Sequence, residues 1–425
     1  MDSKKLRIAL VAFEFPPDTA GGGIGTYMGQ AVRCLVQAGH QVEVFASSTK
    51  REGRFAEVGA TVNLIKTGSI HDFGDLVLPV FRERHSVVGF DVVESPDYFA
   101  DGRAIRAAFP DLPHVVKMHT PLELLHELAV CPGTPSGACR FHWRQMRAAF
   151  QRVIRCKRPL PWRIFRPDIP IRSHWEDIER ENARRADLVV SPSTSLRDWV
   201  VERWGIPRER TVVVPYPYEP NENLLACQPG AGGKMVGYFG RLEHRKGMEV
   251  LAEVVPMVLR AVPDAKFRLV GGSTEHPGRL EPYEKYLKRR WADFLPSIEF
   301  VGRVPLDRMP EEFSKVCVCV FPSLWENFPN VCLEAMSASR AVVGSSRGGM
   351  ADMIESGKNG FLVSPKIHND FAEVIIRLLE DFKLNEAIAI SARKTILMQY
   401  SQDKILKNLQ TSYINAIINK NEHKK

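Results

Sequence analysis

Two glutamates, Glu326 and Glu334, lie eight residues apart in the segment P-S-L-W-E-N-F-P-N-V-C-L-E-A-M, residues 322–336. The apolar run 316–321 predicts a buried strand just before them, and a helix is expected over 330–337. Glu326 then lies in the loop after the strand, and Glu334 lies about one turn into the helix. Carboxylates at a strand end can accept hydrogen bonds from sugar and ribose hydroxyls. The alternative for Glu334 is an exposed position on the helix surface, which its apolar neighbours disfavour.

Two cations, Arg241 and Lys246, follow the predicted strand 235–239 in the loop G-R-L-E-H-R-K-G. A helix is expected over 247–262, so this loop joins a strand end to a helix N-terminus. Cationic side chains and the free N–H groups of a helix N-terminus can together hold a diphosphate. The alternative is a solvated loop.

A glycine-rich loop, G-G-G-I-G at 21–25, follows the predicted strand 6–13 and precedes the predicted helix 26–38. Glycines allow a ligand to approach the backbone closely, and helix N–H groups favour an anion. We therefore expect the loop to bind an anion or the acceptor, the alternative being a flexible turn. The dinucleotide fingerprint G-x-G-x-x-G fails because Met28 occupies its last position, which disfavours a nicotinamide enzyme.

A histidine, His119, directly follows the predicted strand 114–118 and stands two residues before Pro121. Ligands of parallel α/β sheets bind at the carboxyl ends of the strands. We therefore expect His119 to contact a ligand, the alternative being a core histidine.

The elements that must position these residues alternate between strand and helix. A first series of strands is predicted at 6–13, 41–46, 90–94, 114–118, 186–191 and 211–214, and a second at 235–239, 265–270, 297–301, 316–321 and 341–344. Helices are predicted at 26–38, 102–109, 194–204, 247–262, 310–315 and 330–337, and 371–419 is expected to be largely helical. The Pro- and Gly-rich stretch 216–234 predicts an interdomain linker. The expected fold class is α/β, with two doubly wound Rossmann-like units facing a central cleft.

The chain has 425 residues and a formal net charge of +8, and one segment carries the excess. Residues 140–172 contain ten Lys or Arg and one acid, Asp168, so the remaining 48 basic and 49 acidic residues sum to −1. A general nucleic-acid-binding protein would need a wider basic face. A local patch indicates one acidic partner, either a phosphate-bearing substrate or an anionic membrane surface.

Within this basic insert, about 126–180, apolar residues recur at helical spacing from Trp143 onward. Arg144, Arg147 and Arg155 share another side, which predicts a basic amphipathic helix. Its function would be to meet an acceptor or a membrane, and the alternative is a solvated helix packed on the N-terminal domain.

The longest apolar run near the middle of the chain, 316–321, is far too short to span a membrane. The eight cysteines include no C-x-x-C pair, and Cys317 and Cys319 alternate with valines as buried strand residues do. These features favour a reduced, cytoplasmic compartment. The basic insert would place the protein peripherally at the inner face of the membrane.

Taken together, these motifs resemble those of the retaining family 4 glycosyltransferases of GT-B fold, the glycosyl transferases group 1. The C-terminal motifs are Glu326-x7-Glu334, G-R-L-E-H-R-K-G at 240–247, Gly348-Gly349 and G-K-N-G-F-L-V at 357–363. The glycine-rich loop and His119 fit the N-terminal half. The resemblance covers about 1–125 and 180–400.

The resemblance implies a role for each matched residue. Arg241 and Lys246 would hold the donor's diphosphate, and Glu334 would bind the ribose hydroxyls. Glu326 and His119 would contact the transferred sugar and complete the catalytic set. The whole donor site would comprise Gly22, Gly23, Gly25, Arg241, Lys246, Glu326, Asn327, Phe328, Pro329, Asn330, Val331 and Glu334.

Two departures from the family pattern bear on the donor site. Many members carry glycines where this chain has Asn327 and Pro329, and Pro329 has no N–H to offer a ligand. Pro215-Tyr216-Pro217 stands where the family commonly has Pro-Asn-Gly.

The activity implied is transfer of a hexose-type sugar, with retention, from a UDP- or GDP-type sugar to an acceptor hydroxyl. The acceptor would be a glycan, a lipid-linked glycan or a small molecule. No Asp-x-Asp occurs in the chain, so we expect a metal-independent enzyme without a cofactor, in which cations stabilise the leaving diphosphate.

The expected domains are residues 1–222 on the acceptor side, 223–400 on the nucleotide-sugar side, and a C-terminal helix, 401–425, that packs back on the first domain. Two alternatives of the same fold stay open: a nucleotide-sugar epimerase and a catalytically silent sugar-nucleotide-binding subunit. The epimerase would leave the basic insert without a task, and the silent subunit would be expected to have lost motif residues that are present.

Overall fold

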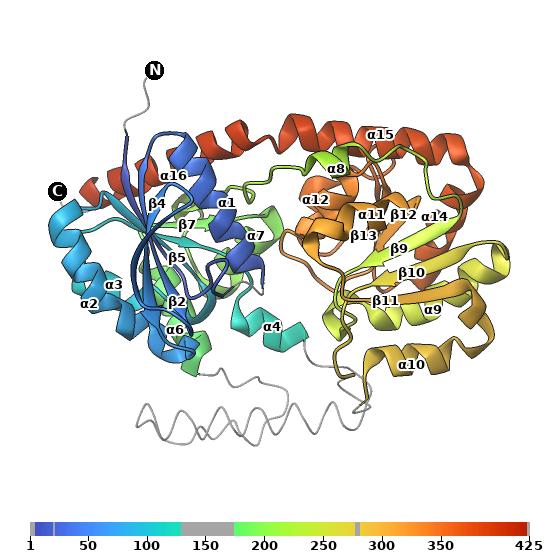
Figure 1. Ribbon diagram of the computed structural model, residues 1–425, viewed down its shortest axis with the longest axis horizontal. Coiled ribbons are helices and arrows are strands. Elements are labelled where there is room, and N and C mark those ends of the chain that lie inside the picture. Colours follow the sequence, from blue (N-terminus) through green and yellow to red (C-terminus); the bar gives the residue numbers. More distant parts are fainter. Residues whose placement is uncertain (1–4, 20–21, 129–173, 277–280, 423–425) are drawn as a thin grey trace. The chain divides into compact units, whose positions relative to one another are not determined.

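The computed structural model describes residues 5–19, 22–128, 174–276 and 281–422 (Figure 1). The chain forms two compact units, and each is described by itself. Of the described residues, unit 1 contains 5–19, 22–125, 174–217 and 402–422, and unit 2 contains 126–128, 218–276 and 281–401. Two units of α/β structure were expected from the two series of strands, and this fold class is confirmed.

Unit 1 is built on an eight-stranded sheet of order β3-β4-β2-β1-β5-β6-β7-β8, parallel except for the antiparallel pair β3–β4. The central strand β1 is paired with β2 on one side and β5 on the other, and its residues Ile8–Val11 are fully buried. A strand covered on both faces needs such a continuous apolar run. The strands are β1 Arg7–Val11, β2 Gln41–Ser48, β3 Gly53–Glu57, β4 Ala60–Lys66, β5 Val92–Pro96, β6 His114–Lys117, β7 Leu188–Ser191 and β8 Thr211–Val213.

Helices cover this sheet, and their ends follow local sequence signals. In α7, Ser193 caps the N-terminus by accepting the Leu196 N–H at 3.3 Å, and Gly205 ends the helix in the left-handed conformation. An aromatic cluster of Phe45, Phe73, Phe81 and Phe90 packs α2 on the sheet. The described helices are α1 Gly23–Gln37, α2 Ile70–Val88, α3 Arg103–Ala108, α4 Leu122–Leu128, α6 His174–Arg184 and α7 Thr194–Trp204.

The helix α16, Gln402–Glu422, completes unit 1 although it follows all of unit 2 in the sequence. Its Tyr413 is fully buried and donates a hydrogen bond of 3.0 Å to Glu94 on β5. Farther along the helix, Lys420 pairs with Asp187 at 3.0 Å. The helix is therefore fixed to the sheet of unit 1 by polar contacts as well as by packing.

Unit 2 is built on a six-stranded, fully parallel sheet of order β11-β10-β9-β12-β13-β14. Its core is mainly aliphatic, formed by the inner face of α9 against β9, β10 and β12. The strands are β9 Met235–Phe239, β10 Lys266–Val270, β11 Ile298–Gly302, β12 Val318–Phe321, β13 Ala341–Ser345 and β14 Phe361–Val363. The helices are α8 Glu222–Leu225, α9 Met248–Ala261, α10 Tyr283–Arg290, α11 Met309–Ser314, α12 Asn330–Ser337, α13 Met350–Met353, α14 His368–Glu380 and α15 Phe382–Gln399.

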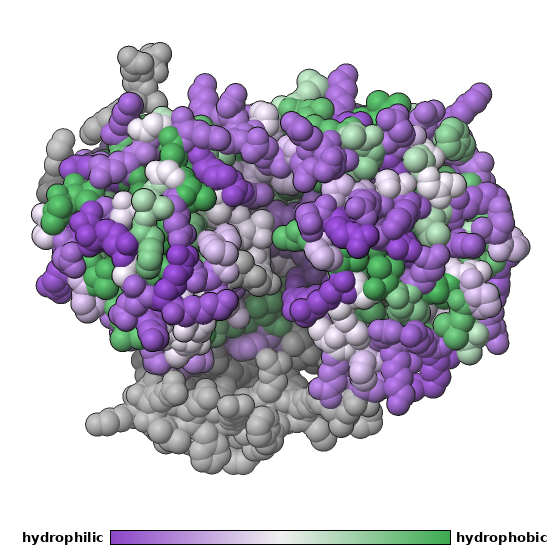
Figure 2. Space-filling model, in the orientation of Figure 1, coloured by the Kyte–Doolittle hydropathy of each residue, from purple (hydrophilic) through white to green (hydrophobic). Residues whose placement is uncertain are grey.

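The surface facing the viewer in Figure 2 is covered mostly by hydrophilic side chains, with apolar residues interspersed. No helix in the described part of the chain is long and apolar enough to cross a membrane. Cys317, just before β12, and Cys319, within it, are buried free thiols, as their alternation with valines predicted.

Candidate functional site

In unit 2, the loops after β9 and β12 lock together at the carboxyl end of the sheet. Gly247 has a φ of +78°, and a Cβ there would lie 2.0 Å from the carbonyl oxygen of Pro322, so only glycine fits. The backbone N–H of Leu324 donates to the carbonyl oxygen of Arg245 at 2.9 Å. The motif G-R-L-E-H-R-K-G is thereby held directly beside the loop that carries Glu326.

Glu326 is buried and is the centre of an ion-pair cluster between these loops. Its Oε1 pairs with Lys246 and accepts the Ser323 hydroxyl at 3.1 Å, and its Oε2 lies 3.4 Å from Arg245. Arg245 also pairs with Glu243 at 3.0 Å, as does Arg241 at 3.3 Å. Three cations thus face two carboxylates, which leaves one positive charge for an anionic ligand.

The charges in this cluster depend on one another because the side chains of Glu326, Lys246 and Arg245 are largely buried. Burial alone would raise the pKa of Glu326, but Lys246 and Arg245 outweigh it and hold that pKa below its ordinary value. Burial lowers the pKa of Lys246, and the nearby Glu326, with a smaller contribution from Glu243, opposes this. The carboxylate therefore keeps the lysine charged, and the two cations keep the carboxylate ionised.

The glycine pair that carries part of the family resemblance lies against the backbone of Glu326. The N–H of Gly349 donates to the Glu326 carbonyl oxygen at 2.8 Å. Gly348 has a φ of +86°, and a Cβ there would lie 2.0 Å from the same oxygen. The pair fixes the loop in which Glu326 lies, without itself adding a polar side chain.

Glu334 lies on α12, one turn from its start, as the sequence predicted. Its side chain is half-buried, and burial raises its pKa to about 7. No side chain of the described chain caps the N-terminus of α12, which begins after Pro329, and the carboxamide oxygen of Asn330 is buried there without a partner among the described residues. The N–H groups in the first turn of α12 can therefore still donate hydrogen bonds to a ligand.

The two residues before Pro329 are buried against the rest of unit 2. Asn327 and Phe328 are each almost fully covered, and the Phe328 ring lies 5.7 Å from that of Tyr400. The side chain of Phe328 is therefore a support for the loop, while its backbone and that of Val331 stay at the carboxyl end of the sheet.

In unit 1, His119 lies two residues after the end of β6, one residue farther from the strand than predicted, and three groups hold it. Its backbone N–H donates to Asp97 Oδ1 at 2.7 Å, and its Nδ1 lies 2.9 Å from the Tyr216 hydroxyl. The rings of His119 and Tyr216 are stacked with centroids 5.2 Å apart, and Tyr27 meets the imidazole edge-on at 5.3 Å. Burial, helped by the charge of Lys117, lowers the pKa of His119 to about 3, so the imidazole is neutral.

A buried lysine lies beneath these rings. Lys117 donates from Nζ to the Val214 carbonyl oxygen at 2.7 Å and lies 5.2 Å and 5.3 Å from the ring centres of Tyr27 and Tyr216. Burial lowers its pKa to about 7 although Glu94 opposes this. Aromatic faces and one carbonyl thus replace the water that a charged lysine would need.

The glycine-rich loop holds a carboxylate that the sequence did not predict. Gly23 and Gly25 form the first turn of α1, with Gly22 as its N-cap, and the N–H of Gly25 donates to Glu14 Oε2 at 3.1 Å. We expected this helix N-terminus to be open to an external anion, and instead a side chain from the end of β1 occupies part of it. Burial raises the pKa of Glu14, which eases its neutralisation if an anionic ligand approaches.

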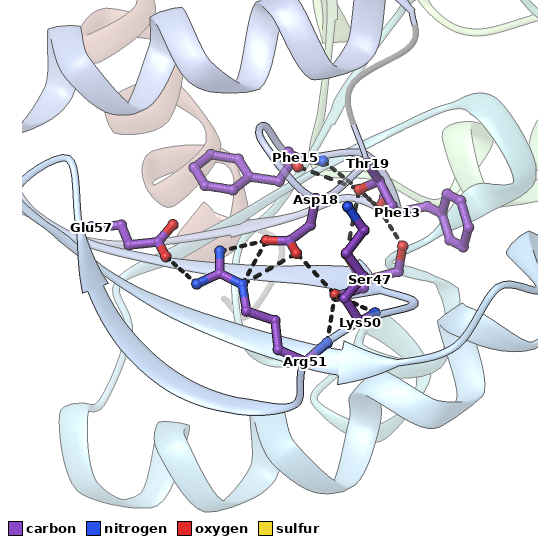
Figure 3. A network of polar contacts seen from close by, with 9 residues as sticks. Phe13, Phe15, Asp18, Thr19, Ser47, Lys50, Arg51 and Glu57 are labelled. Atoms are coloured by element: carbon purple, nitrogen blue, oxygen red, sulfur yellow. Dashed lines mark hydrogen bonds and ion pairs between the residues drawn. The ribbon is translucent and has the colours of Figure 1, made fainter.

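The segment before these glycines is tied to the end of β2. Figure 3 shows the carboxylate of Asp18 beside the guanidinium of Arg51. Asp18 also accepts a hydrogen bond of 3.0 Å from the hydroxyl of Ser48, the last residue of β2. Arg51 also pairs with Glu57 at 2.7 Å, and Thr19 donates to the carbonyl oxygen of Phe13 at 3.0 Å. Polar contacts therefore fix the chain between Phe13 and Thr19, the described segment that precedes the glycines.

A second group of acids surrounds the backbone near His119. Asp97, Asp101 and Glu179 are buried, and burial raises the pKa of each, to about 7 for Asp97 and about 8 for Asp101. Glu179 accepts the N–H groups of Phe99 and Leu122, at 2.8 and 2.9 Å. These acids hold loop backbone in place, and they are neutral over much of the pH range in which surface carboxylates are charged.

The structure brings the predicted residues of unit 2 together: Lys246 forms an ion pair with Glu326, and Glu334 lies in the helix that follows. Arg241 is largely exposed. Sequence reasoning missed Arg245, although it lies in the same motif, and it missed the Tyr216 contact with His119. Arg144, Arg147 and Arg155 of the basic insert lie outside the described residues.

Two family models match the chain. The model described as Glycosyltransferase Family 4 matches residues 21–222, and the model described as Glycosyl transferases group 1 matches residues 233–381. An uncharacterized glycosyltransferase of Methanocaldococcus jannaschii is 30% identical over 239 residues, which span 53% of this chain and 59% of that relative, less than two thirds of its length.

Solved structures match nearly the whole chain at low identity. Sucrose-phosphate synthase from Thermosynechococcus elongatus has a TM-score of 0.72 and 20% identity, covering 97% of this chain and 100% of its own. Anabaena HepE in complex with UDP-glucose has a TM-score of 0.64 and 17% identity, covering 95% of this chain and 98% of its own. At these identities the likeness shows the fold, which is GT-B.

Proposed function

Because the chain belongs to the family 4 glycosyltransferases, the glycosyl transferases group 1, we propose that it transfers a hexose, with retention, from a nucleotide-diphosphate sugar to an acceptor hydroxyl. The observation that carries this proposal is the buried cluster of Glu326, Lys246 and Arg245 at the carboxyl ends of β9 and β12. The complex of a GT-B relative with UDP-glucose supports a donor of this class.

The diphosphate is assigned to the cations of the β9 loop. Lys246 and Arg241, which the family motif marks, are joined by Arg245, and the three exceed the two carboxylates that now pair with them. A bound diphosphate adds negative charge where one positive charge is in excess. As the bond from the sugar to the diphosphate breaks, the growing charge on the leaving oxygen is stabilised by Lys246 and Arg245, which ion pairs hold in the buried part of the cluster, and by the more exposed Arg241.

The sugar and the ribose are assigned to the β12 loop and α12. Glu326 accepts hydrogen bonds from sugar hydroxyls while Lys246 and Arg245 keep it ionised, and the N–H groups of the first turn of α12 donate to the same ligand. Glu334 binds ribose hydroxyls. With a pKa raised to about 7, it can accept a hydrogen bond as the carboxylate or donate one as the acid.

His119 is assigned to the sugar near the reacting carbon, where a neutral imidazole adds no repulsion to the positive charge that develops there. The acceptor oxygen forms its bond to the anomeric carbon on the face from which the diphosphate departs. The acceptor's proton passes to the departing phosphate oxygen, so that neither a covalent enzyme intermediate nor a metal ion is required.

The basic insert and the location of the protein complete the proposal. Arg144, Arg147 and Arg155 bind an anionic membrane surface or a lipid-linked acceptor, and the enzyme acts in the cytoplasm at the inner face of the membrane. Reversing these three charges should reduce sedimentation with anionic liposomes and leave donor hydrolysis unchanged. Unchanged sedimentation would remove the membrane from the proposal.

The test of the donor site is thermal stabilisation by UDP, GDP, ADP and their hexose conjugates, with and without EDTA. We expect one nucleotide and its sugar to raise the melting temperature, equally with and without the chelator. Lys246→Ala should abolish the shift, and Lys288→Ala, which removes an exposed lysine paired with Glu284 on α10, should retain it. No shift with any nucleotide would refute the donor-site assignment.

Turnover distinguishes transfer from its alternatives. A transferase releases nucleoside diphosphate and yields a product whose anomeric proton coupling in NMR matches that of the donor. Conversion of one nucleotide sugar into another without release of diphosphate would instead indicate an epimerase, and binding without turnover a silent subunit.

A further inference from the structure

The hydroxyl group of Tyr216 lies within hydrogen-bond distance of two different groups. It is 3.1 Å from the backbone carbonyl oxygen of Met118 and 2.9 Å from Nδ1 of His119. Tyr216 is buried and stands at the position where the family pattern commonly has Asn. The contact is therefore a feature of this chain and not part of the motif that the chain shares with its family.

The chemistry of the three groups decides where the protons lie. A carbonyl oxygen can only accept, so the single phenolic proton of Tyr216 must be donated to Met118. If Tyr216 donated to His119 instead, its oxygen and the Met118 carbonyl oxygen would face each other as two acceptors. Both contacts are satisfied only if Nδ1 of His119 carries a proton and donates it to the Tyr216 oxygen. In a neutral imidazole, Nε2 then has a lone pair and no proton.

We infer that Tyr216 is a positioning residue that holds His119 in the Nδ1–H tautomer, so that Nε2 accepts a hydrogen bond from a hydroxyl group of the transferred sugar. This inference rests on the proposed function, in which His119 faces the sugar. The inference narrows the substrate class, because the transferred sugar must present a hydroxyl group to Nε2 of His119. A nucleotide sugar with a carboxylate at that position is disfavoured, because the carboxylate and Nε2 are both hydrogen-bond acceptors.

The surroundings keep this arrangement in place. Burial disfavours a second proton on the imidazole, and the charge of Lys117, which lies 5.3 Å from the Tyr216 ring centre, acts in the same direction. The stacked Tyr216 ring and the bond from the His119 N–H to Asp97 fix the plane and the position of the imidazole. Because the ring is fixed and only one tautomer is present, Nε2 accepts a hydrogen bond from one direction. This is what the selection of a particular sugar hydroxyl requires.

The first test needs no substrate. Protein labelled with 15N-histidine is observed by long-range 1H–15N correlation, and His119→Asn identifies the His119 signals among those of the twelve histidines. We expect a protonated Nδ1 and an unprotonated Nε2. A protonated Nε2 in the wild-type protein would overturn the inference whatever the enzyme does.

The second test is Tyr216→Phe, which keeps the stacked ring and removes only the hydroxyl. The control is Tyr413→Phe, which removes a buried hydroxyl in the same unit from a residue that bonds Glu94 and not His119. We expect the His119 signals to shift toward the other tautomer in Tyr216→Phe alone. With the nucleotide sugar that gives the largest thermal shift, kcat should fall about tenfold, the worth of one hydrogen bond, while the donor KM stays within about twofold.

A set of monodeoxy analogues of the same donor identifies the hydroxyl. One analogue should lower kcat of the wild-type enzyme about tenfold and have a much smaller effect on Tyr216→Phe, because the lost contact is the same. Equal sensitivity of both proteins to every analogue would overturn the link to the sugar. Failure of all nucleotide sugars to bind would instead refute the proposed function, and the NMR result would still decide the tautomer.

Discussion

Asp97→Asn should stabilise the protein, and by an amount that depends on pH. Asp97 is fully buried after β5, its Oδ1 accepts the His119 N–H, and its Oδ2 has no partner among the described residues. Burial raises its pKa from 3.8 to about 7. Asparagine keeps the acceptor oxygen for His119 and carries no charge in either state.

The sign and size of this stability difference follow from the linkage between proton binding and folding. Between pH 4 and pH 7 the unfolded chain has lost the proton of Asp97 and the folded protein has kept it, so rising pH favours unfolding. Three pKa units at about 1.4 kcal/mol each give a full cost of about 4 kcal/mol, reached at about pH 7 and constant above it. The free energy of unfolding of Asp97→Asn should therefore match that of the wild type at pH 4 and exceed it by up to about 4 kcal/mol at pH 8.

The assay is urea denaturation at pH 4, 6 and 8, followed by tryptophan fluorescence. The difference between variant and wild type is the quantity to compare, because His114 and His119, whose pKa values burial lowers to about 3, change the stability of both proteins equally. The control Asp72→Asn, at an exposed position in the first turn of α2, should leave the pH profile unchanged. A difference that is equal at pH 4 and pH 8, or a variant less stable at pH 8, would refute the reasoning.

Three further perturbations address the other buried polar groups. Lys246→Met and Glu326→Gln should each lower the free energy of unfolding by about 3 kcal/mol, because each leaves a buried charge unpaired. The double variant should lose less than the sum of the two single losses. Additive losses in urea denaturation would mean that the pair is not coupled. Arg340→Met should destabilise unit 2 by about 3 to 5 kcal/mol, because the guanidinium donates to the backbone carbonyl oxygens of residues 228, 231, 316 and 338. A change in melting temperature no larger than that of a surface variant would contradict this prediction. Tyr413→Phe should cost about 1 to 2 kcal/mol and increase hydrogen exchange of α16; unchanged exchange there would show that packing alone holds the helix.

The sequence predicted best those elements whose apolar period is uninterrupted. The strand 235–239 and the helices 194–204 and 330–337 have the predicted bounds, because each combines a clear period with a local end signal. The elements β3, β4 and α2 were missed. The strand β3, Gly53–Glu57, lies at the edge of the sheet with no fully buried residue and so has no apolar run, and α2 contains Pro79 within its length.

For the candidate site, the sequence predicted where residues lie but not which residues touch. Lys246 and Glu326 were both placed after strands, yet their pairing joins residues 80 positions apart. The Tyr216 contact with His119 joins residues 97 positions apart, and nothing in the local pattern at Tyr216 marks it. Local periodicity contains no information on such contacts, which depend on strand order and on the paths of the loops.

The bond between Tyr413 and Glu94 has a consequence for the order in which the chain is made. During synthesis, every residue of unit 2 leaves the ribosome before α16 does. Over three hundred residues are made after Glu94 before Tyr413, one of its two tyrosine partners, is available. All segments of unit 2 precede α16 in the chain, so unit 2 can close while unit 1 is still incomplete. The nascent protein would then have a finished C-terminal unit and an unfinished N-terminal one, the reverse of the usual sequence of events. A binding partner or chaperone that acts during translation would therefore meet the open core of unit 1.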